Sequence, residues 1–284
     1  MQQLPRDKQC LKARRMMNEH GVPTLRPWLV RGFRKYSRGL LRKNFHTICV
    51  DRSALDLQAI GERPLIVAAN HASWWDPLIA ALLCESLFPQ RSMYAPIDAI
   101  ALNKYRILGQ MGFYGLDLHT RHGAESFLKI SKAILKLPNS SIWLTPEGRF
   151  CDVRDRSAPL MPGMSHLASK IPDLAIVCLA MEYTYWEESR PEVICHVASP
   201  LIDLEGNWTK KDWQEKLECQ LRSAQDRLAQ RSIARDTQGL QVLVRRGEKT
   251  ESWYDFSRYW WARLQGKSIE LHHGAKFEDG EATS

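Results

Sequence analysis

Short apolar segments alternate with segments of helical periodicity between residues 45 and 205, and this alternation limits the possible folds more than any other feature. The segments predicted as strands are 65–69, 92–95, 112–118, 141–145, 174–180 and 192–198. The helical patterns between them cover 77–87, 100–111, 125–137 and 163–170. The alternation predicts one α/β domain, with a mostly parallel central sheet flanked by helices and ligands bound at the carboxyl ends of the strands.

A basic amphipathic helix is predicted before this domain, at residues 25–43. Four apolar or aromatic side chains recur at helical spacing, and no acidic residue interrupts seven cations: Leu29, Phe33, Tyr36 and Leu40, with Arg26, Arg31, Arg34, Lys35, Arg38, Arg42 and Lys43. The pattern is typical of a helix that lies on an anionic membrane. A basic, solvated face on a helix packed against the core is the alternative, and nucleic acid binding is a weaker one.

The charge balance also favours an anionic partner. Lys and Arg number 40 against 32 Asp and Glu, which gives a net charge of +8. The seven cysteines occur singly, without a C-x-x-C pair, which favours reduced thiols in the cytosol. The first 24 residues are polar, unlike a signal peptide, and no apolar run approaches the roughly 20 residues of a membrane span. We expect a peripheral protein at the cytoplasmic face of a membrane, with no transmembrane span and no nucleic acid partner.

A second helix, predicted at 207–232, has one apolar side formed by Trp213, Leu217, Leu221 and Leu228. Six aromatic residues lie among cations at 252–267. The chain is therefore divided into a basic membrane-docking segment (1–44), a catalytic domain (45–205), a helical extension (206–266) and a disordered tail (267–284).

The stretch NHASWWDP carries the first candidate site residues, Asn70, His71 and Asp76. His71 follows a predicted strand, where an α/β fold exposes functional groups, and an imidazole accepts a proton near neutral pH. Five steps of about 100° leave the two side chains about 140° apart around a straight helix, so the intervening residues must turn if the side chains are to meet. Asp76 before Pro77 also has the pattern of a helix N-cap. Both interpretations are compatible, because a rigid carboxylate would orient the histidine.

The stretch TPEGRF carries the second set, Glu147, Gly148 and Arg149, after the strand predicted at 141–145. A carboxylate, a flexible turn and a guanidinium are thereby expected at the same edge of the sheet as His71. The alternative is a surface turn with two solvated charges.

The two stretches together resemble the motifs of the glycerolipid acyltransferase family, of the 1-acylglycerol-3-phosphate (lysophospholipid) type. NHASWWDP is similar to its N-H-x-x-x-x-D block, TPEGRF to its Pro-Glu-Gly block, and Arg121 to its substrate-binding arginine. The resemblance extends over residues 45 to 200. This chain departs from the family pattern in two blocks that bear on the acceptor. Gly148 is followed directly by Arg149, without the usual threonine, and the late strand reads IVCLAMEYTYW, where the family usually has Pro-Val.

The resemblance implies an O-acyltransferase that uses acyl-CoA or acyl carrier protein as donor and needs no cofactor and no metal. His71 would be the general base for an acceptor hydroxyl, Asp76 would orient it with Asn70 in support, and Arg121, Glu147, Gly148 and Arg149 would hold the acceptor. A lysophospholipid is the expected acceptor. The alternatives are a glycolipid or glycosylated isoprenoid alcohol, a hydrolase that activates water, and a non-catalytic peripheral lipid-binding protein of the same fold.

Overall fold

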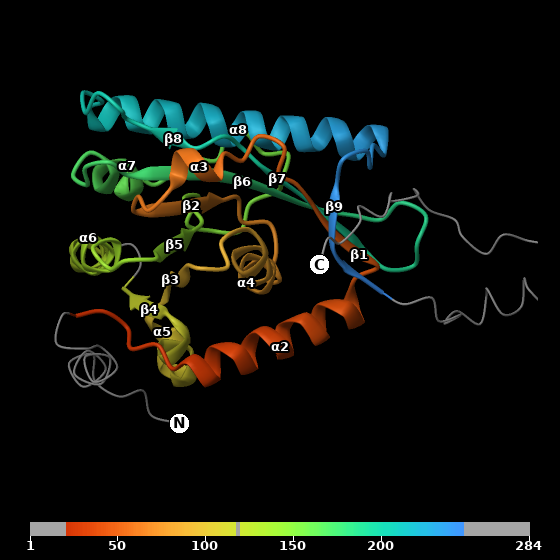
Figure 1. Ribbon diagram of the computed structural model, residues 1–284, viewed down its shortest axis with the longest axis horizontal. Coiled ribbons are helices and arrows are strands. Elements are labelled where there is room, and N and C mark those ends of the chain that lie inside the picture. The colour runs from red at the N-terminus through yellow and green to blue at the C-terminus, as the bar shows by residue number, and fades with distance from the viewer. Residues whose placement is uncertain (1–20, 118–119, 247–284) are drawn as a thin grey trace, which may run out of the picture.

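A central sheet organises the chain (Figure 1). It contains the six predicted strands and three that the sequence pattern did not predict, at 47–51, 201–202 and 241–245. The strand at 241–245 lies in the segment predicted as a helical extension, so that prediction is wrong for these residues. The computed structural model describes residues 21–117 and 120–246. Within them the strands are β1 (Thr47–Asp51), β2 (Leu65–Ala69), β3 (Ser92–Asp98), β4 (Phe113–Leu116), β5 (Ser140–Leu144), β6 (Ala175–Thr184), β7 (Glu192–Val197), β8 (Leu201–Ile202) and β9 (Gln241–Arg245). Their order in the sheet is β4-β3-β5-β2-β6-β7-β1-β9, with β8 paired to β6.

Most of the strand pairs are parallel, which confirms the predicted fold class. β2 pairs in parallel with β5 and β6, β3 with β4 and β5, and β1 with β7. Antiparallel pairs join β6 to β7, β6 to β8 and β1 to β9. Because β4, β3, β5 and β2 are successive parallel neighbours, their carboxyl ends meet at one edge of the sheet.

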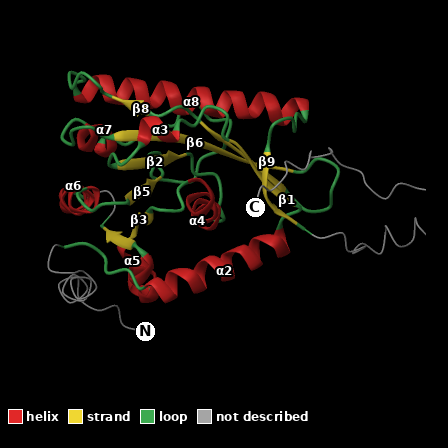
Figure 2. Cartoon of the chain, viewed as in Figure 1, coloured by secondary structure: helices red, strands yellow, loops and turns green. Residues whose placement is uncertain are grey.

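Helices cover both faces of the sheet (Figure 2). The helices are α2 (Pro27–Asn44), α3 (Leu57–Ile60), α4 (Asp76–Leu87), α5 (Ala99–Lys104), the 3₁₀ helix η1 (Arg106–Met111), α6 (Arg121–Leu135), α7 (Gly163–Ala168) and α8 (Lys210–Ala234). Buried side chains of α6, α7 and α8 share one core cluster with the sheet, and those of α2, α3 and α4 share another. β2 contributes Ile66 and Ala68 to the first cluster and Val67 to the second, which explains its unbroken apolar sequence.

α8 begins with a capping box, in which the Thr209 side chain accepts from the Asp212 amide and the Asp212 carboxylate accepts from the Thr209 amide. Its predicted apolar side is buried against the sheet, with Trp213, Leu217 and Leu221 at most 2% exposed. The C-terminal helix is therefore packed on the same core as the α/β domain.

The basic helix predicted at 25–43 is α2, but its apolar side faces the protein. Phe33 and Leu40 pack against the core cluster that includes α4. Tyr36, predicted to share that side, is 64% exposed, and Trp28 is 60% exposed. Arg38 donates to Glu85 on α4 at 3.1 Å. The remaining face of α2 is exposed and carries Arg31, Lys35, Arg42 and Lys43.

Part of the predicted organisation lies outside the described residues: the segment 1–20, the aromatic segment at 252–267 and the tail at 267–284. These stay predictions. Among the residues that are described, no helix is long and apolar enough to cross a bilayer.

Candidate active site

The end of β2 is fixed by Asn70, which is buried. Its side-chain amide donates to the Met181 carbonyl at 3.0 Å, and its carbonyl accepts from the Met181 amide at 2.7 Å. The Asn70 side-chain amide thus makes the two hydrogen bonds to β6 that a backbone residue of a paired strand would make. This pairing fixes the point at which the chain leaves the sheet, directly before His71.

His71 and Asp76 meet, as the motif requires. The His71 Nδ1 lies 2.7 Å from Asp76 Oδ2, with 20% of the histidine and 3% of the aspartate side chain exposed. The chain between them turns: the Asp76 amide donates to the Ser73 carbonyl at 3.1 Å. Because the carboxylate only accepts, Nδ1 carries the proton, and Nε2 keeps a lone pair that can take a proton from a substrate.

Asp76 is not a helix cap, so this part of the prediction is wrong. It is the first residue of α4, Trp75 precedes it at the cap position, and no side-chain capping bond is formed there. Its Oδ2 accepts from the Ser73 amide at 3.0 Å as well as facing His71, and its Oδ1 accepts from the Tyr183 hydroxyl at 2.5 Å. The carboxylate is fixed by these bonds to its own loop and to β6.

Tyr183 on β6 is a site residue that the sequence did not reveal. Burial, together with the negative charge of Asp76, raises the pKa of the Tyr183 hydroxyl far above its usual value. The phenol therefore stays protonated and serves as a donor to Asp76. β6 extends through Thr184, whereas its predicted apolar core ends at residue 180, so the sequence did not mark Tyr183 as a residue that faces the site.

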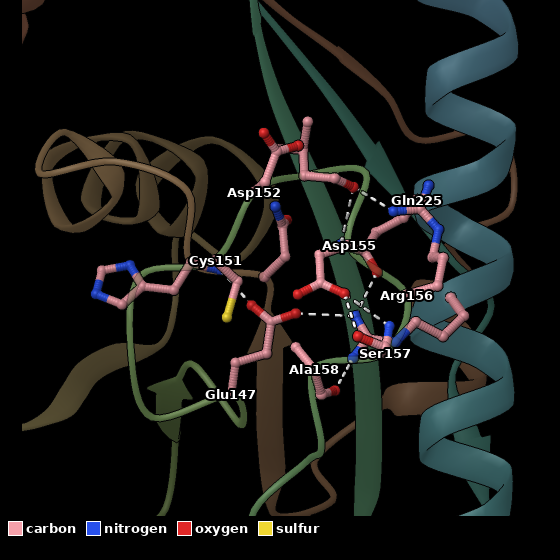
Figure 3. A network of polar contacts seen from close by, with 12 residues as sticks. Glu147, Cys151, Asp152, Asp155, Arg156, Ser157, Ala158 and Gln225 are labelled. Carbon is pink, nitrogen blue, oxygen red and sulfur yellow. Dashed lines mark hydrogen bonds and ion pairs between the residues drawn. The ribbon is translucent and has the colours of Figure 1, made fainter.

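Glu147 follows β5 at the expected edge, but its carboxylate is buried. Its side chain is 1% exposed; Oε2 accepts from the backbone amide of His71 at 3.0 Å, and Oε1 accepts from Arg222 on α8 at 2.8 Å. Figure 3 shows the carboxylate turned toward α8. The alternative interpretation, a surface turn with two solvated charges, is therefore wrong for Glu147, which fixes the histidine backbone.

The residues after Glu147 wrap around the histidine. Gly148 has a φ of +65°, in the left-handed region, and a Cβ there would lie 2.3 Å from the Met161 sulfur, so the turn favours glycine. The Phe150 ring lies against the His71 ring with a centroid distance of 4.2 Å, and the Cys151 amide donates to the His71 carbonyl at 2.8 Å.

The two arginines predicted to bind the acceptor lie at different distances from His71. Arg149 is exposed on the segment that wraps the histidine. Arg121 begins α6 after β4, is 93% exposed and pairs with Glu125 at 3.0 Å. Neighbouring strands lie about 4.8 Å apart, so the three strand intervals between β4 and β2 separate the ends of these two strands by roughly 14 Å along the same edge. The structure does not bring Arg121 into contact with the dyad.

Among the described residues, no group of three or more His, Cys, Asp or Glu side chains is arranged to hold a metal ion. Burial, together with the charge of Glu147, raises the pKa of the Cys151 thiol.

Comparison with known proteins gave a family match and a similar solved structure. The Acyltransferase family model matches residues 44–182. No curated protein matches the chain. Among solved structures, the crystal structure of the 1-acyl-sn-glycerophosphate (LPA) acyltransferase, PlsC, from Thermotoga maritima is similar with a TM-score of 0.48 and 16% identity, over 69% of this chain and 79% of that chain. The matched segment contains both the His71–Asp76 pair and the Pro-Glu-Gly turn, so residues 44–182 are similar to the Acyltransferase family.

Proposed function

We propose that the protein transfers a fatty acyl group from an acyl thioester to a hydroxyl of a lysophospholipid-like acceptor, with His71 as general base. The observation that carries the proposal is the 2.7 Å contact between His71 Nδ1 and the buried Asp76 carboxylate, which leaves Nε2 of a partly exposed imidazole as the proton acceptor. General-base catalysis by a positioned side chain typically contributes about 10²–10⁴-fold.

The reaction needs one proton relay. His71 Nε2 takes the proton of the acceptor hydroxyl as its oxygen attacks the thioester carbonyl carbon, and Asp76 stabilises the imidazolium that forms. When the carbon–sulfur bond breaks, the thiolate leaves and takes this proton from Nε2. The products are an ester and a free thiol, and His71 returns to its starting state. No side chain forms a covalent intermediate. Acyl-CoA and acyl carrier protein are equally suitable donors in this scheme, which requires no cofactor.

The acceptor is held by exposed cations beside the dyad. Arg149 follows the turn that fixes His71, and its guanidinium suits a phosphate or another anionic head group. Arg121 lies farther along the edge and would contact a more remote part of the acceptor. Glu147 and Gly148 contribute through the backbone: the carboxylate holds the His71 amide, and the glycine permits the turn that places Arg149.

The exposed face of α2 is proposed to dock the protein peripherally at the cytoplasmic face of an anionic membrane. Because the apolar side of α2 packs on the protein, the attraction comes from Arg31, Lys35, Arg42 and Lys43, at roughly 1 kcal/mol for each cation near the surface. Trp28 and Tyr36 lie on the same helix and suit the headgroup boundary.

The test is an acyl-transfer assay with product identification. The purified protein is offered acyl-CoA or acyl carrier protein together with a total lipid extract, and the lipids that accumulate are analysed by mass spectrometry. An acylated lysophospholipid supports the proposal, and an acylated glycolipid or isoprenoid glycoside would replace the acceptor. Free fatty acid formed equally with and without an alcohol would mean a hydrolase. No turnover of any donor would leave a lipid-binding protein.

A further inference from the structure

The C-terminal helix α8 reaches the candidate active site through one side chain, Arg222. Its guanidinium donates to Glu147 Oε1 at 2.8 Å, and the other carboxylate oxygen, Oε2, accepts from the His71 amide at 3.0 Å. A cation on α8 and the catalytic histidine are thus separated by a single carboxylate. We propose that Arg222 is a positioning residue for His71 and that it acts through the charge of Glu147. The inference rests on the proposed function of His71.

Burial makes this link sensitive to charge. The Glu147 side chain is 1% exposed and that of Arg222 11%, so water screens their interaction poorly. Among the described residues, Arg222 is the cation that pairs with Glu147. Without it the carboxylate would be left buried and uncompensated, a state that proteins avoid by rearrangement or by neutralising the group. Either response changes the position or the charge of the Glu147 oxygen that accepts from the His71 amide.

Arg222 is itself held in place by the loop that follows the Pro-Glu-Gly turn. Its second guanidinium nitrogen donates to the Ala158 carbonyl, and the first also donates to Gln225 at 2.8 Å. Gln225 in turn donates to the Val153 carbonyl at 3.4 Å (Figure 3). The guanidinium therefore ties three parts of the molecule together: α8, the loop after the turn, and the carboxylate behind His71.

This arrangement places a functional residue outside the segment that carries the family motifs. The family match ends at residue 182, and α8 begins at Lys210. We infer that the helix is part of the catalytic unit and does more than cover the sheet. An error of about 1 Å in the placement of a catalytic group can cost about 10²-fold in rate, so loss of Arg222 should lower kcat rather than weaken substrate binding.

The central comparison is between Arg222→Met and a matched control, Asp226→Asn. Asp226 lies one turn farther along α8 and accepts from Arg156 of the same loop at 2.6 Å, with no contact to Glu147. Arg222→Met is expected to lower kcat about 10²-fold with both KM values within about threefold of wild type, and Asp226→Asn to stay within about threefold throughout. Arg222→Lys should recover at least about tenfold of the lost kcat, because it restores the charge without the guanidinium bonds to the loop. Equal losses in Arg222→Met and Asp226→Asn, or no recovery with lysine, would overturn the proposal.

A double-mutant cycle tests whether Arg222 acts through Glu147. A glutamine at position 147 can still accept from the His71 amide but carries no charge, so Arg222→Met should cost less than about threefold in kcat in an E147Q background. A further loss of about 10²-fold in that background would overturn the proposal. If Arg222→Met alone does not fold, the comparison of E147Q with the double variant still tests the proposal, because the double variant has no unpaired charge.

A measurement without substrates separates this inference from the proposed function. The His71 ring resonance, assigned by its loss in His71→Ala, is followed by NMR in wild type, Arg222→Met and Asp226→Asn. The inference predicts a displaced resonance in Arg222→Met and an unchanged one in Asp226→Asn. An unchanged resonance in both would overturn it whether or not the protein transfers acyl groups, whereas a wild-type protein without acyl transfer would overturn only the proposed function.

Discussion

Replacement of Asp76 by asparagine separates the charge of this residue from its hydrogen bonds. The His71 and Ser73 donors both face Oδ2, and the Tyr183 hydroxyl faces Oδ1. An asparagine with its carbonyl oxygen at the Oδ2 position would still accept from His71 and from the Ser73 amide. Its NH₂ group would then face Tyr183, whose hydroxyl can rotate and accept. The tautomer of His71 is then preserved, and the negative charge alone is removed.

The size of the effect follows from the distance. The charge of an imidazolium and that of the Asp76 carboxylate lie about 4 Å apart when averaged over each group, where the attraction is about 4 kcal/mol at an effective dielectric constant of 20. If all of it acted in the transition state, kcat would fall by about 10³-fold. We therefore expect Asp76→Asn to lower kcat by about 10²–10³-fold and to lose less than His71→Ala. The expected ranking comes from the surviving acceptor oxygen, not from a helix cap.

The assay is kcat with donor and acceptor both saturating, together with a thermal melt of each variant. A wild-type kcat in Asp76→Asn would refute the electrostatic role of the carboxylate. A loss as large as that of His71→Ala would show that the asparagine amide does not keep the histidine in place.

Three further predictions concern the acceptor, the membrane and stability. Arg149→Ala and Arg121→Ala should raise the KM for the acceptor far more than that for the donor in steady-state kinetics, with the larger effect at Arg149; equal effects on both substrates would assign these arginines to the donor. Reversal of Arg31 and Lys35 to glutamate should abolish sedimentation with anionic vesicles and leave turnover of a detergent-dispersed acceptor, and wild-type binding should weaken as salt rises; salt-insensitive binding would contradict the docking face. Burial, with the charge of a neighbouring glutamate, raises the pKa of Glu192 to about 7. The folded protein therefore keeps this proton at pH values where the unfolded chain, with the ordinary glutamate pKa, has lost it. Stability falls as the pH rises from the ordinary glutamate pKa to the raised one. Glu192→Gln, which removes the titration, should therefore raise the free energy of unfolding at pH 8 by up to about 3 kcal/mol and change it little at pH 5, as measured by urea denaturation; an equal change at both pH values would contradict this.

The sequence predicted the scaffold and the edge at which the site lies. The apolar runs that became β2 and β5 are neighbouring parallel strands, so His71 and Glu147 come together as the strand-end rule requires. The five-residue spacing also correctly required a turn before Asp76. These successes depend on local pattern and on one topological rule.

The rest depends on contacts between distant parts of the chain. Tyr183 lies 107 residues from Asp76, and Arg222 lies 75 residues from Glu147. Nothing in their own neighbourhoods marks either as a partner of the site: Tyr183 falls beyond the apolar core of its strand, and Arg222 is one of several cations on a long helix. The misplacement of Tyr36 on α2 has the same origin, because helical spacing alone does not say which side of the helix the core will cover.

The rate of acyl transfer by His71→Ala tests most directly whether His71 is the general base. The variant removes the imidazole while Asp76 keeps its bonds to Ser73 and Tyr183, so the fold should survive, as a thermal melt would verify. With acyl thioester and lysophospholipid both saturating, we expect a kcat about 10²–10⁴-fold below wild type. A well-folded His71→Ala protein with the full wild-type kcat would contradict it.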